Sequence, residues 1–303
     1  MTETSRKPAA RIRAKRTPKW WIKRLIRLLV IAYVVVGLLL WVGQRWLVFP
    51  GTVMQGSART RFGPAIDSEQ LTLHTADGTE IAAVFYPAII PRRNAVTTPA
   101  RRPTVISFYG NAQCVAWCQY EVDIMRRCGA NVLVADYPGF GQSKGTASEL
   151  GMYATADALW NHAMGRPDVD PSRIIASGWS LGGAAAIDLA SRKPVAGLIA
   201  ASSFTSLPDM GHKQFPIYPT SWLLRYKMDN LQKIGSIQCP TLFIHGLADP
   251  LVPAEMSRRL YAASGASTRT LLEIPDAQHN DLFATGYFPI SEAIAEFLTQ
   301  TAH

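Results

Sequence analysis

The sequence is poor in charge and in cysteine for its length. Charged residues make up 17% of the 303 residues and hydrophobic residues 48%, a balance that excludes an intrinsically disordered chain. Four cysteines are too few for a disulfide-stapled fold, and the 22 glycines and 20 prolines exclude a collagen repeat. No His, Cys, Asp or Glu cluster has zinc-site spacing, and the glycine-rich segment 139–145 lacks the Gly-Lys-Ser/Thr ending of a phosphate loop. We therefore expect a globular protein without metal or cofactor.

The net charge of +9 is confined to the N-terminus. Residues 1–27 contain ten of the 31 basic residues and one acid, Glu3, which leaves the rest of the chain with 21 bases and 21 acids. A basic tail can contact anionic lipid or nucleic acid. The orientation of a membrane segment explains it with fewer assumptions, and we expect no nucleic-acid partner.

One long hydrophobic run follows the tail. Leu28–Gly43 contains sixteen uncharged residues, which form about 25 Å of helix at roughly 1.5 Å per residue, the short end of a bilayer span. Arg27 and Arg45 can lengthen it by extending outward. The run is flanked on both sides by tryptophans, as in an aromatic belt: Trp20, Trp21, Trp41 and Trp46. These flanks favour a membrane span over the buried helix of a soluble domain. No small-residue cleavage site follows, which favours an uncleaved signal anchor over a signal peptide.

The distribution of basic residues predicts the orientation of this span. Ten bases precede it, whereas only Arg45, Arg59 and Arg61 follow soon after, so the N-terminus is expected in the cytoplasm. We predict a single-pass membrane protein with a cytoplasmic tail over residues 1–27 and a signal anchor over 28–46. The globular domain over 47–303 would then be extracytoplasmic, in a periplasm or lumen.

The body combines two hydrophobic patterns. Glu69–His74 and Thr79–Tyr86 alternate apolar and polar residues around Asp77-Gly78, which predicts an antiparallel hairpin. After an expected loop at Ile90–Pro103, short apolar runs alternate with helix-length segments, which indicates an α/β fold with a mostly parallel sheet covered by helices on both faces. The expected strands are Thr104–Tyr109, Asn131–Ala135, Ile174–Ser177, Val195–Ala200, Thr241–His245 and Thr270–Ile274, and the expected helices Cys114–Cys128, Ala147–His162, Leu181–Ser191, Pro253–Ser264 and Pro289–Leu298.

A candidate nucleophile follows one of these strands. Ligands bind such sheets at the carboxyl ends of the strands. Gly178-Trp179-Ser180-Leu181-Gly182 has the pattern G-x-S-x-G between a strand and a helix, a tight turn that lifts the serine hydroxyl above the sheet. The alternative is a glycine-rich helix start with Ser180 as its N-cap.

A serine nucleophile needs a general base, and the base needs an orienting carboxylate. Asp249 follows Thr241–His245 and His279 follows Thr270–Ile274, in the chain order Ser, acid, His that this motif requires. We predict a triad of Ser180, Asp249 and His279. The acids adjacent to His279 are too close in sequence to approach it from a separate loop, and the other histidines lie elsewhere or precede the acid: Asp276 and Asp281; His74, His162, His212, His245 and His303.

The tetrahedral intermediate of acyl transfer needs donors for its oxyanion. The backbone N–H of Leu181, directly after the nucleophile, is the first candidate. The second is expected from the loop Phe108-Tyr109-Gly110-Asn111-Ala112, where Gly110 permits close approach and the N–H of Asn111 or Ala112 would point inward. We favour Asn111. The alternative is an ordinary strand-to-helix turn.

Together these segments resemble the α/β-hydrolase family. The similarity rests on FYGNA, DYPGFGQSKG, GWSLGG, PTLFIHGLADPLVP and AQHND, and it covers the chain from about Phe49 to the C-terminus. The chain is similar in particular to single-span, membrane-anchored serine hydrolases, in which an aromatic-proline segment such as Trp46–Pro50 follows the anchor. The resemblance implies an α/β-hydrolase fold, the triad above, and hydrolysis of an ester, thioester or amide. Tyr109 stands where many relatives have histidine, which leaves the donor and the support of that loop open.

Residues 203–239 depart from the strand–helix alternation and are expected to form a short cap. Its aromatic residues either bind a hydrophobic substrate or attach the cap to the body: Phe204, Phe215, Tyr218, Trp222 and Tyr226. Cys114 and Cys118 lie four apart on an expected helix, where a disulfide is geometrically awkward. Cys128 and Cys239 precede well-separated strands. We expect four reduced, buried thiols.

The sequence predicts a membrane-anchored serine hydrolase that cleaves carboxylic esters or thioesters, including lipid-like acyl substrates, through an acyl-enzyme. Its expected partners are a small-molecule or lipid-like ester and the membrane, and the sequence sets no oligomeric state. Two alternatives stay open: a serine peptidase or amidase of the same fold, and a catalytically silent, anchored binding module.

Overall fold

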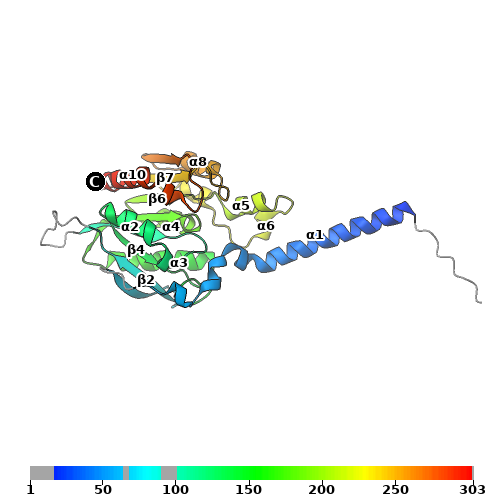
Figure 1. Ribbon diagram of the computed structural model, residues 1–303, viewed down its shortest axis with the longest axis horizontal. Helices are drawn as coiled ribbons and strands as arrows, with labels where there is room; N and C mark the ends of the chain where they lie inside the picture. Colours follow the sequence, from blue (N-terminus) through cyan, green and yellow to red (C-terminus); the bar gives the residue numbers. More distant parts are fainter. Residues whose placement is uncertain (1–16, 64–67, 90–100, 302–303) are drawn as a thin grey trace, which may run out of the picture. The chain divides into compact units, whose positions relative to one another are not determined.

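The computed structural model describes residues 17–63, 68–89 and 101–301, and the chain divides into two compact units, Met1–Gly43 and Gln44–His303 (Figure 1). Helix α1, Pro18–Val48, contains the apolar run and starts ten residues before it. Its most apolar window of 18 residues has a mean hydropathy of 2.6 and is not buried at all. The helix is therefore long and apolar enough to cross a bilayer, a property that membrane anchors and signal sequences share.

The body is built on one eight-stranded sheet with the order β1-β2-β4-β3-β5-β6-β7-β8. The pairs β1–β2 and β2–β4 are antiparallel, and all other neighbours are parallel. This confirms the expected hairpin leading into a parallel sheet. The strands are β1 Glu69–His74, β2 Glu80–Tyr86, β3 Arg102–Phe108, β4 Asn131–Ala135, β5 Val169–Trp179, β6 Gly197–Ala201, β7 Thr241–Gly246 and β8 Arg269–Ile274.

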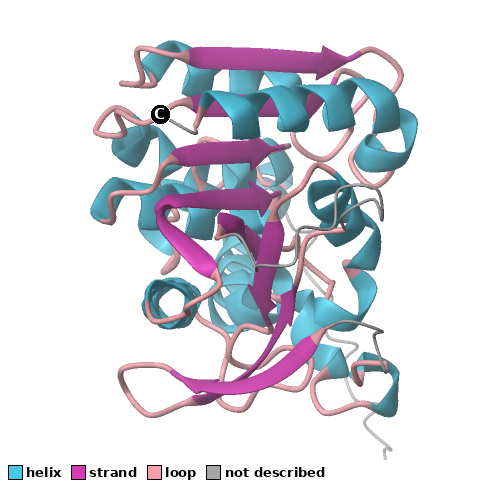
Figure 2. Cartoon of the chain, turned by 90° about the vertical axis from the view of Figure 1, so that its left-hand side faces the viewer, coloured by secondary structure: helices cyan, strands magenta, loops and turns pink. Residues whose placement is uncertain are grey.

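Helices lie on both sides of this sheet (Figure 2). Helix α2 contacts α10, whereas α3, α4, α7 and α8 contact one another in succession. Every residue of β4, β6 and β7 is buried, because helices cover both faces of the sheet. The helices are α2 Gln119–Arg127, α3 Glu149–Met164, α4 Leu181–Arg192, α5 Leu207–Gln214, α6 Thr220–Leu223, α7 Asn230–Ile234, α8 Ala254–Ala263, α9 Leu282–Thr285 and α10 Tyr287–Gln300, with 3₁₀ turns at Pro50–Met54, Ala58–Thr60 and Val115–Trp117.

The expected helix at Cys114–Cys128 is wrong in its first third. Cys114 is extended, a 3₁₀ turn follows, and α2 starts only at Gln119. The cause is tertiary, because the buried carboxylate of Asp136 accepts the Val115 N–H at 2.8 Å and holds the chain away from the helical path. Cys114 and Cys118 therefore do not share a regular helix.

Two further expectations need correction. Of the loop expected at Ile90–Pro103, residues 90–100 lie outside the described part, and Arg102 and Pro103 belong to β3. All four thiols are free, as expected, but only Cys114 and Cys118 are buried; Cys128 and Cys239 are partly exposed.

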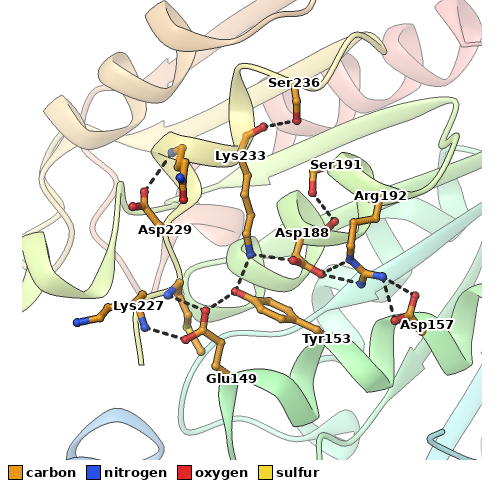
Figure 3. A network of polar contacts seen from close by, with 12 residues as sticks. Glu149, Tyr153, Asp157, Asp188, Ser191, Arg192, Lys227, Asp229, Lys233 and Ser236 are labelled. Atoms are coloured by element: carbon orange, nitrogen blue, oxygen red, sulfur yellow. Dashed lines mark hydrogen bonds and ion pairs between the residues drawn. The ribbon is translucent and has the colours of Figure 1, made fainter. Parts of the chain in front are cut away.

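The segment between β6 and β7 contains the short helices α5, α6 and α7, and a polar network holds its second half to the body (Figure 3). The Glu149 carboxylate accepts the backbone N–H groups of Lys227 and Met228 at 2.7 and 2.9 Å. Lys233 Nζ donates to Tyr153 Oη at 3.0 Å and to the buried Asp188 at 2.7 Å. Hydrogen bonds that involve a charged group contribute about 1.5–3 kcal/mol each, so these residues attach the end of the segment firmly to α3 and α4.

Candidate active site

Ser180 occupies a sharp turn between β5 and α4. Its φ and ψ are 54° and −118°, a strained conformation for a residue with a side chain. The turn closes only because its glycines have no side chains. A Cβ at Gly178 would lie 2.3 Å from the Gly182 carbonyl oxygen, and one at Gly182 would lie 2.0 Å from the Phe108 carbonyl oxygen. The G-x-S-x-G spacing thus follows from local steric contact.

The structure brings Ser180, His279 and Asp249 together from three separate strand ends. His279 Nε2 lies 2.8 Å from Ser180 Oγ, and His279 Nδ1 lies 2.6 Å from Asp249 Oδ2. All three residues are buried. An ionised carboxylate can only accept, so Nδ1 carries the imidazole proton and Nε2 is left to accept the Ser180 hydroxyl proton. This is the arrangement that a serine nucleophile requires.

Asp249 is held by more than the imidazole. Its Oδ1 accepts the backbone N–H groups of Leu251 and Val252, both at 2.9 Å. Burial raises the pKa of the Asp249 carboxyl, but hydrogen bonding from His245 and His279 outweighs it and holds the pKa well below its usual range. The carboxylate therefore stays charged at any physiological pH and keeps His279 in one tautomer.

His245 is a supporting residue that the sequence did not identify. It ends β7, is fully buried, and its Nε2 lies 2.9 Å from the Val252 carbonyl oxygen and 3.5 Å from Asp249 Oδ2. Its Nδ1 lies 2.6 Å from Ser257 Oγ. Both neighbours of Nε2 are acceptors, so Nε2 carries the proton and faces the carboxylate. The only sequence signal was the i, i+4 spacing of His245 and Asp249.

Trp179 supports the other side of the imidazole. Its ring stacks on that of His279 with centroids 5.3 Å apart and an interplanar angle of 29°. The same ring lies against Gly110, where a Cβ would come within 2.6 Å of it. Trp179 thus contacts both the His279 ring and the loop after β3, and Gly110 allows that close approach.

The loop after β3 contains the second predicted oxyanion donor, and its N–H groups differ in whether they have an acceptor. Asn111 Oδ1 accepts the Ala112 N–H at 3.0 Å, and Gln113 Oε1 accepts the Gly110 N–H at 3.2 Å. Of the two N–H groups considered from the sequence, that of Ala112 is therefore already engaged. Among the described hydrogen bonds, the N–H groups of Asn111 and Leu181 have no acceptor. Their role as oxyanion donors stays a prediction.

Tyr109 supports this loop through hydrogen bonds with Asp136 and Tyr137. Its hydroxyl donates to Asp136 Oδ1 at 3.1 Å and accepts the Tyr137 N–H at 3.2 Å. Tyr137 Oη in turn donates to the Tyr109 carbonyl oxygen at 2.9 Å. Burial raises the pKa of the Asp136 carboxyl. The Asp136 side chain packs against Gly141. A Cβ at position 141 would lie only 1.9 Å from Asp136 Oδ2.

The remaining candidates from the sequence do not join this site. Asp276 is exposed, and Asp281 accepts the Gln278 N–H at 2.6 Å rather than a proton from His279. His162, on α3, has its Nε2 3.5 Å from Arg166 Nη1, and His303 lies outside the described residues. Within the described ranges, no group of three His, Cys, Asp or Glu side chains is placed to hold a metal ion.

The low pKa of Asp249 predicts a pH-dependent contribution to stability. Its folded pKa lies below its unfolded value of about 3.9, so this contribution is complete above roughly pH 5 and is lost as the pH falls further. We expect Asp249→Asn to unfold at a lower denaturant concentration than the wild type at pH 7, and the difference to shrink between pH 5 and pH 3. Equilibrium unfolding of the full chain in detergent measures it, with Asp276→Asn as the exposed control. A difference that is constant with pH would contradict the assignment.

The family of the protein follows from comparison with known proteins. Residues 118–287, more than half of the chain, match the prolyl oligopeptidase family. An uncharacterized protein of Mycobacterium tuberculosis is 33% identical over 276 residues, which cover 90% of this chain and 94% of the relative. The alpha/beta hydrolase domain-containing protein WAV2 of Arabidopsis thaliana is 31% identical over 236 residues, covering 72% and 74%. A Pyrococcus furiosus esterase shares the fold, with a TM-score of 0.66 at 19% identity over 80% of this chain and 95% of its own. The expected fold and family are thereby confirmed: the chain belongs to the α/β-hydrolase family and, within it, to the prolyl oligopeptidase family.

Proposed function

We propose that the protein is a membrane-anchored serine hydrolase that cleaves carboxylic esters or thioesters through an acyl-enzyme at Ser180. One observation carries the proposal: a continuous hydrogen-bonded line from Ser180 Oγ through His279 to Asp249, with distances of 2.8 and 2.6 Å, at a strained turn. A catalytically silent copy of the fold has no chemical reason to keep these three groups in register.

The geometry supports a two-step acyl transfer. Ser180 Oγ attacks the substrate carbonyl carbon while its proton passes to His279 Nε2, and Asp249 stabilises the imidazolium. His279 then returns the proton to the leaving alcohol or thiol as the tetrahedral intermediate collapses to the acyl-enzyme. A water molecule repeats the sequence, which releases the carboxylic acid and restores the Ser180 hydroxyl. The N–H groups of Leu181 and Asn111 would bind the oxyanion in both steps.

Labelling with a fluorophosphonate tests the nucleophile, because this reagent needs an activated serine. We expect the full chain to be labelled, Ser180→Ala to be unlabelled, and ester turnover to fall by about 10⁴-fold or more in Ser180→Ala and His279→Ala. Ser191→Ala, at the far end of α4, is the matched serine control and should label like the wild type. A folded wild type that resists the probe would refute the enzyme and favour an anchored binding module.

Two observations favour ester cleavage over amide cleavage. The Pyrococcus furiosus neighbour is an esterase by its name, and the cap exposes the apolar side chains of Phe215 and Trp222, which suit lipid-like acyl substrates. The prolyl oligopeptidase match favours a second candidate, a serine peptidase or amidase with the same catalytic groups.

A substrate panel separates these two candidates. We expect p-nitrophenyl esters from acetate to palmitate to be hydrolysed by the full chain with a kcat/KM at least about tenfold above that for aminoacyl p-nitroanilides. Both classes release a coloured nitro-aromatic product, and Ser180→Ala measures the background for each. Faster cleavage of the amides would overturn the ester assignment and establish the peptidase.

Membrane anchoring and orientation form the second part of the proposal. Residues 1–27 would be a cytoplasmic tail, 28–46 the signal anchor, and 47–303 an extracytoplasmic catalytic domain with its cap at about 203–239. The support is the unburied, apolar α1 and the basic residues before it. Protease added outside intact spheroplasts should digest the catalytic domain, whereas a cytoplasmic marker protein stays intact. Protection of the domain would contradict the orientation.

A further inference from the structure

Hydrogen bonds join the end of α1 to the cap and to the loop after β3. Gln44 Nε2 donates to the Leu223 carbonyl oxygen at 2.9 Å, and Gln44 Oε1 accepts the Arg225 N–H at 2.7 Å. Four residues later, the Val48 carbonyl oxygen accepts Asn111 Nδ2 at 2.7 Å. The first contact reaches the cap and the second reaches the predicted oxyanion loop. All of these residues belong to the unit that starts at Gln44.

Chain continuity links the cap to the predicted membrane span through Gln44. Gln44 directly follows Gly43, the last residue of the apolar run, at a helical rise of about 1.5 Å. The cap residues that bind Gln44 are therefore hydrogen-bonded to the residue that directly follows the apolar run. This conclusion depends on the covalent connection and the two Gln44 hydrogen bonds alone.

The same part of the cap exposes large apolar side chains. Trp222 on α6 is 89% exposed, Ile217 is 70% exposed and Phe215 is 39% exposed. No acidic residue occurs from Gly211 to Met228, whereas Lys213, Arg225 and Lys227 are basic and exposed. Exposed tryptophan beside basic residues is typical of surfaces that lie in the headgroup region of an anionic bilayer.

The cap is also fixed to the catalytic acid loop. Lys213 Nζ donates to the carbonyl oxygens of Pro250 and Leu251, at 3.0 and 3.1 Å, directly after Asp249. At its other end, the Glu149 network attaches residues 227–228 to α3 (Figure 3). The exposed apolar residues Phe215, Ile217 and Trp222 thus lie on a segment that is held at both ends. Its first half contacts the loop that carries Asp249.

We infer that the cap edge formed by Phe215, Ile217 and Trp222 inserts into the headgroup region of the membrane that holds α1, so that the Ser180 site takes its ester substrate from the bilayer. This inference rests on the proposed anchored hydrolase. It specifies the substrate class as amphiphilic esters resident in the membrane. The occupant of the exposed edge is lipid.

The first test measures membrane contact without using activity. Trp222→Cys is labelled with an environment-sensitive nitrobenzoxadiazole probe in the full chain, reconstituted in phosphatidylcholine–phosphatidylglycerol vesicles with and without spin-labelled lipid. Burial raises the pKa of Cys114 and of Cys239 to about 11 and also raises that of Cys118 and Cys128, so native thiols react slowly at neutral pH. Phe288→Cys on α10, where Phe288 is 82% exposed, is the matched control.

We expect spin-labelled lipid to quench the probe at position 222 and to leave the probe at position 288 unchanged. Equal fluorescence with and without spin label at position 222, or equal quenching at both positions, would overturn the inference. Because this readout needs no turnover, it stands even if the proposed hydrolase activity fails.

The second test measures the consequence for substrate. The rate with a vesicle-embedded long-chain ester, divided by the rate with water-soluble p-nitrophenyl acetate, should fall about tenfold in Trp222→Ser. Phe288→Ser should keep the wild-type ratio. A ratio that is the same in Trp222→Ser and the wild type would refute substrate uptake from the bilayer. Loss of both rates in the wild type would instead refute the proposed hydrolase.

Discussion

The buried Asp249 carboxylate is the charge on which the candidate site depends. A carboxylate without water is costly unless donors surround it, and here two backbone N–H groups and the imidazole of His279 supply them. Because these donors lower its pKa, Asp249 remains an acceptor and forces the His279 proton onto Nδ1. Ser180 then faces an imidazole nitrogen that is free to accept. The state of the Ser180 hydroxyl on one loop thus depends on the hydrogen bonds that the Asp249 carboxylate accepts on another loop.

The parallel sheet brings these three side chains together without a special connection between their loops. Strands β5, β7 and β8 run parallel in the sheet, so the residues that follow them, Ser180, Asp249 and His279, meet at the same edge. Close contacts then require glycine at three positions. Glycines at positions 178 and 182 let the turn close, and Gly110 lets the next loop approach Trp179, whose ring holds His279 in place. The strain at Ser180 is sustained by these surroundings rather than relieved within the turn.

The last residues of α1 are hydrogen-bonded to the body of the protein rather than joined to it by a loop. Gln44 binds the cap and Val48 binds Asn111. Phe49 is fully buried, with its ring 5.0 Å from that of Tyr226. All of these contacts lie within the unit that begins at Gln44, so its first residues pack as part of the body. Of the five cap aromatics, Phe204 and Tyr218 are buried, Tyr226 is partly buried, and Phe215 and Trp222 are exposed.

Local pattern determined a large part of this protein. The sheet, the turn at Ser180 and the apolar run of α1 were predictable because periodicity, glycine sterics and hydrophobicity act over a few residues. Tertiary structure decided the rest. The delayed start of α2 depends on Asp136, the support of Asp249 on His245, and the role of Tyr109 on a carboxylate 27 residues away. The attachment of Gln44 to the cap joins residues 179 positions apart. No local periodicity specifies such contacts, because they exist only once distant segments have packed and left polar groups that must find partners.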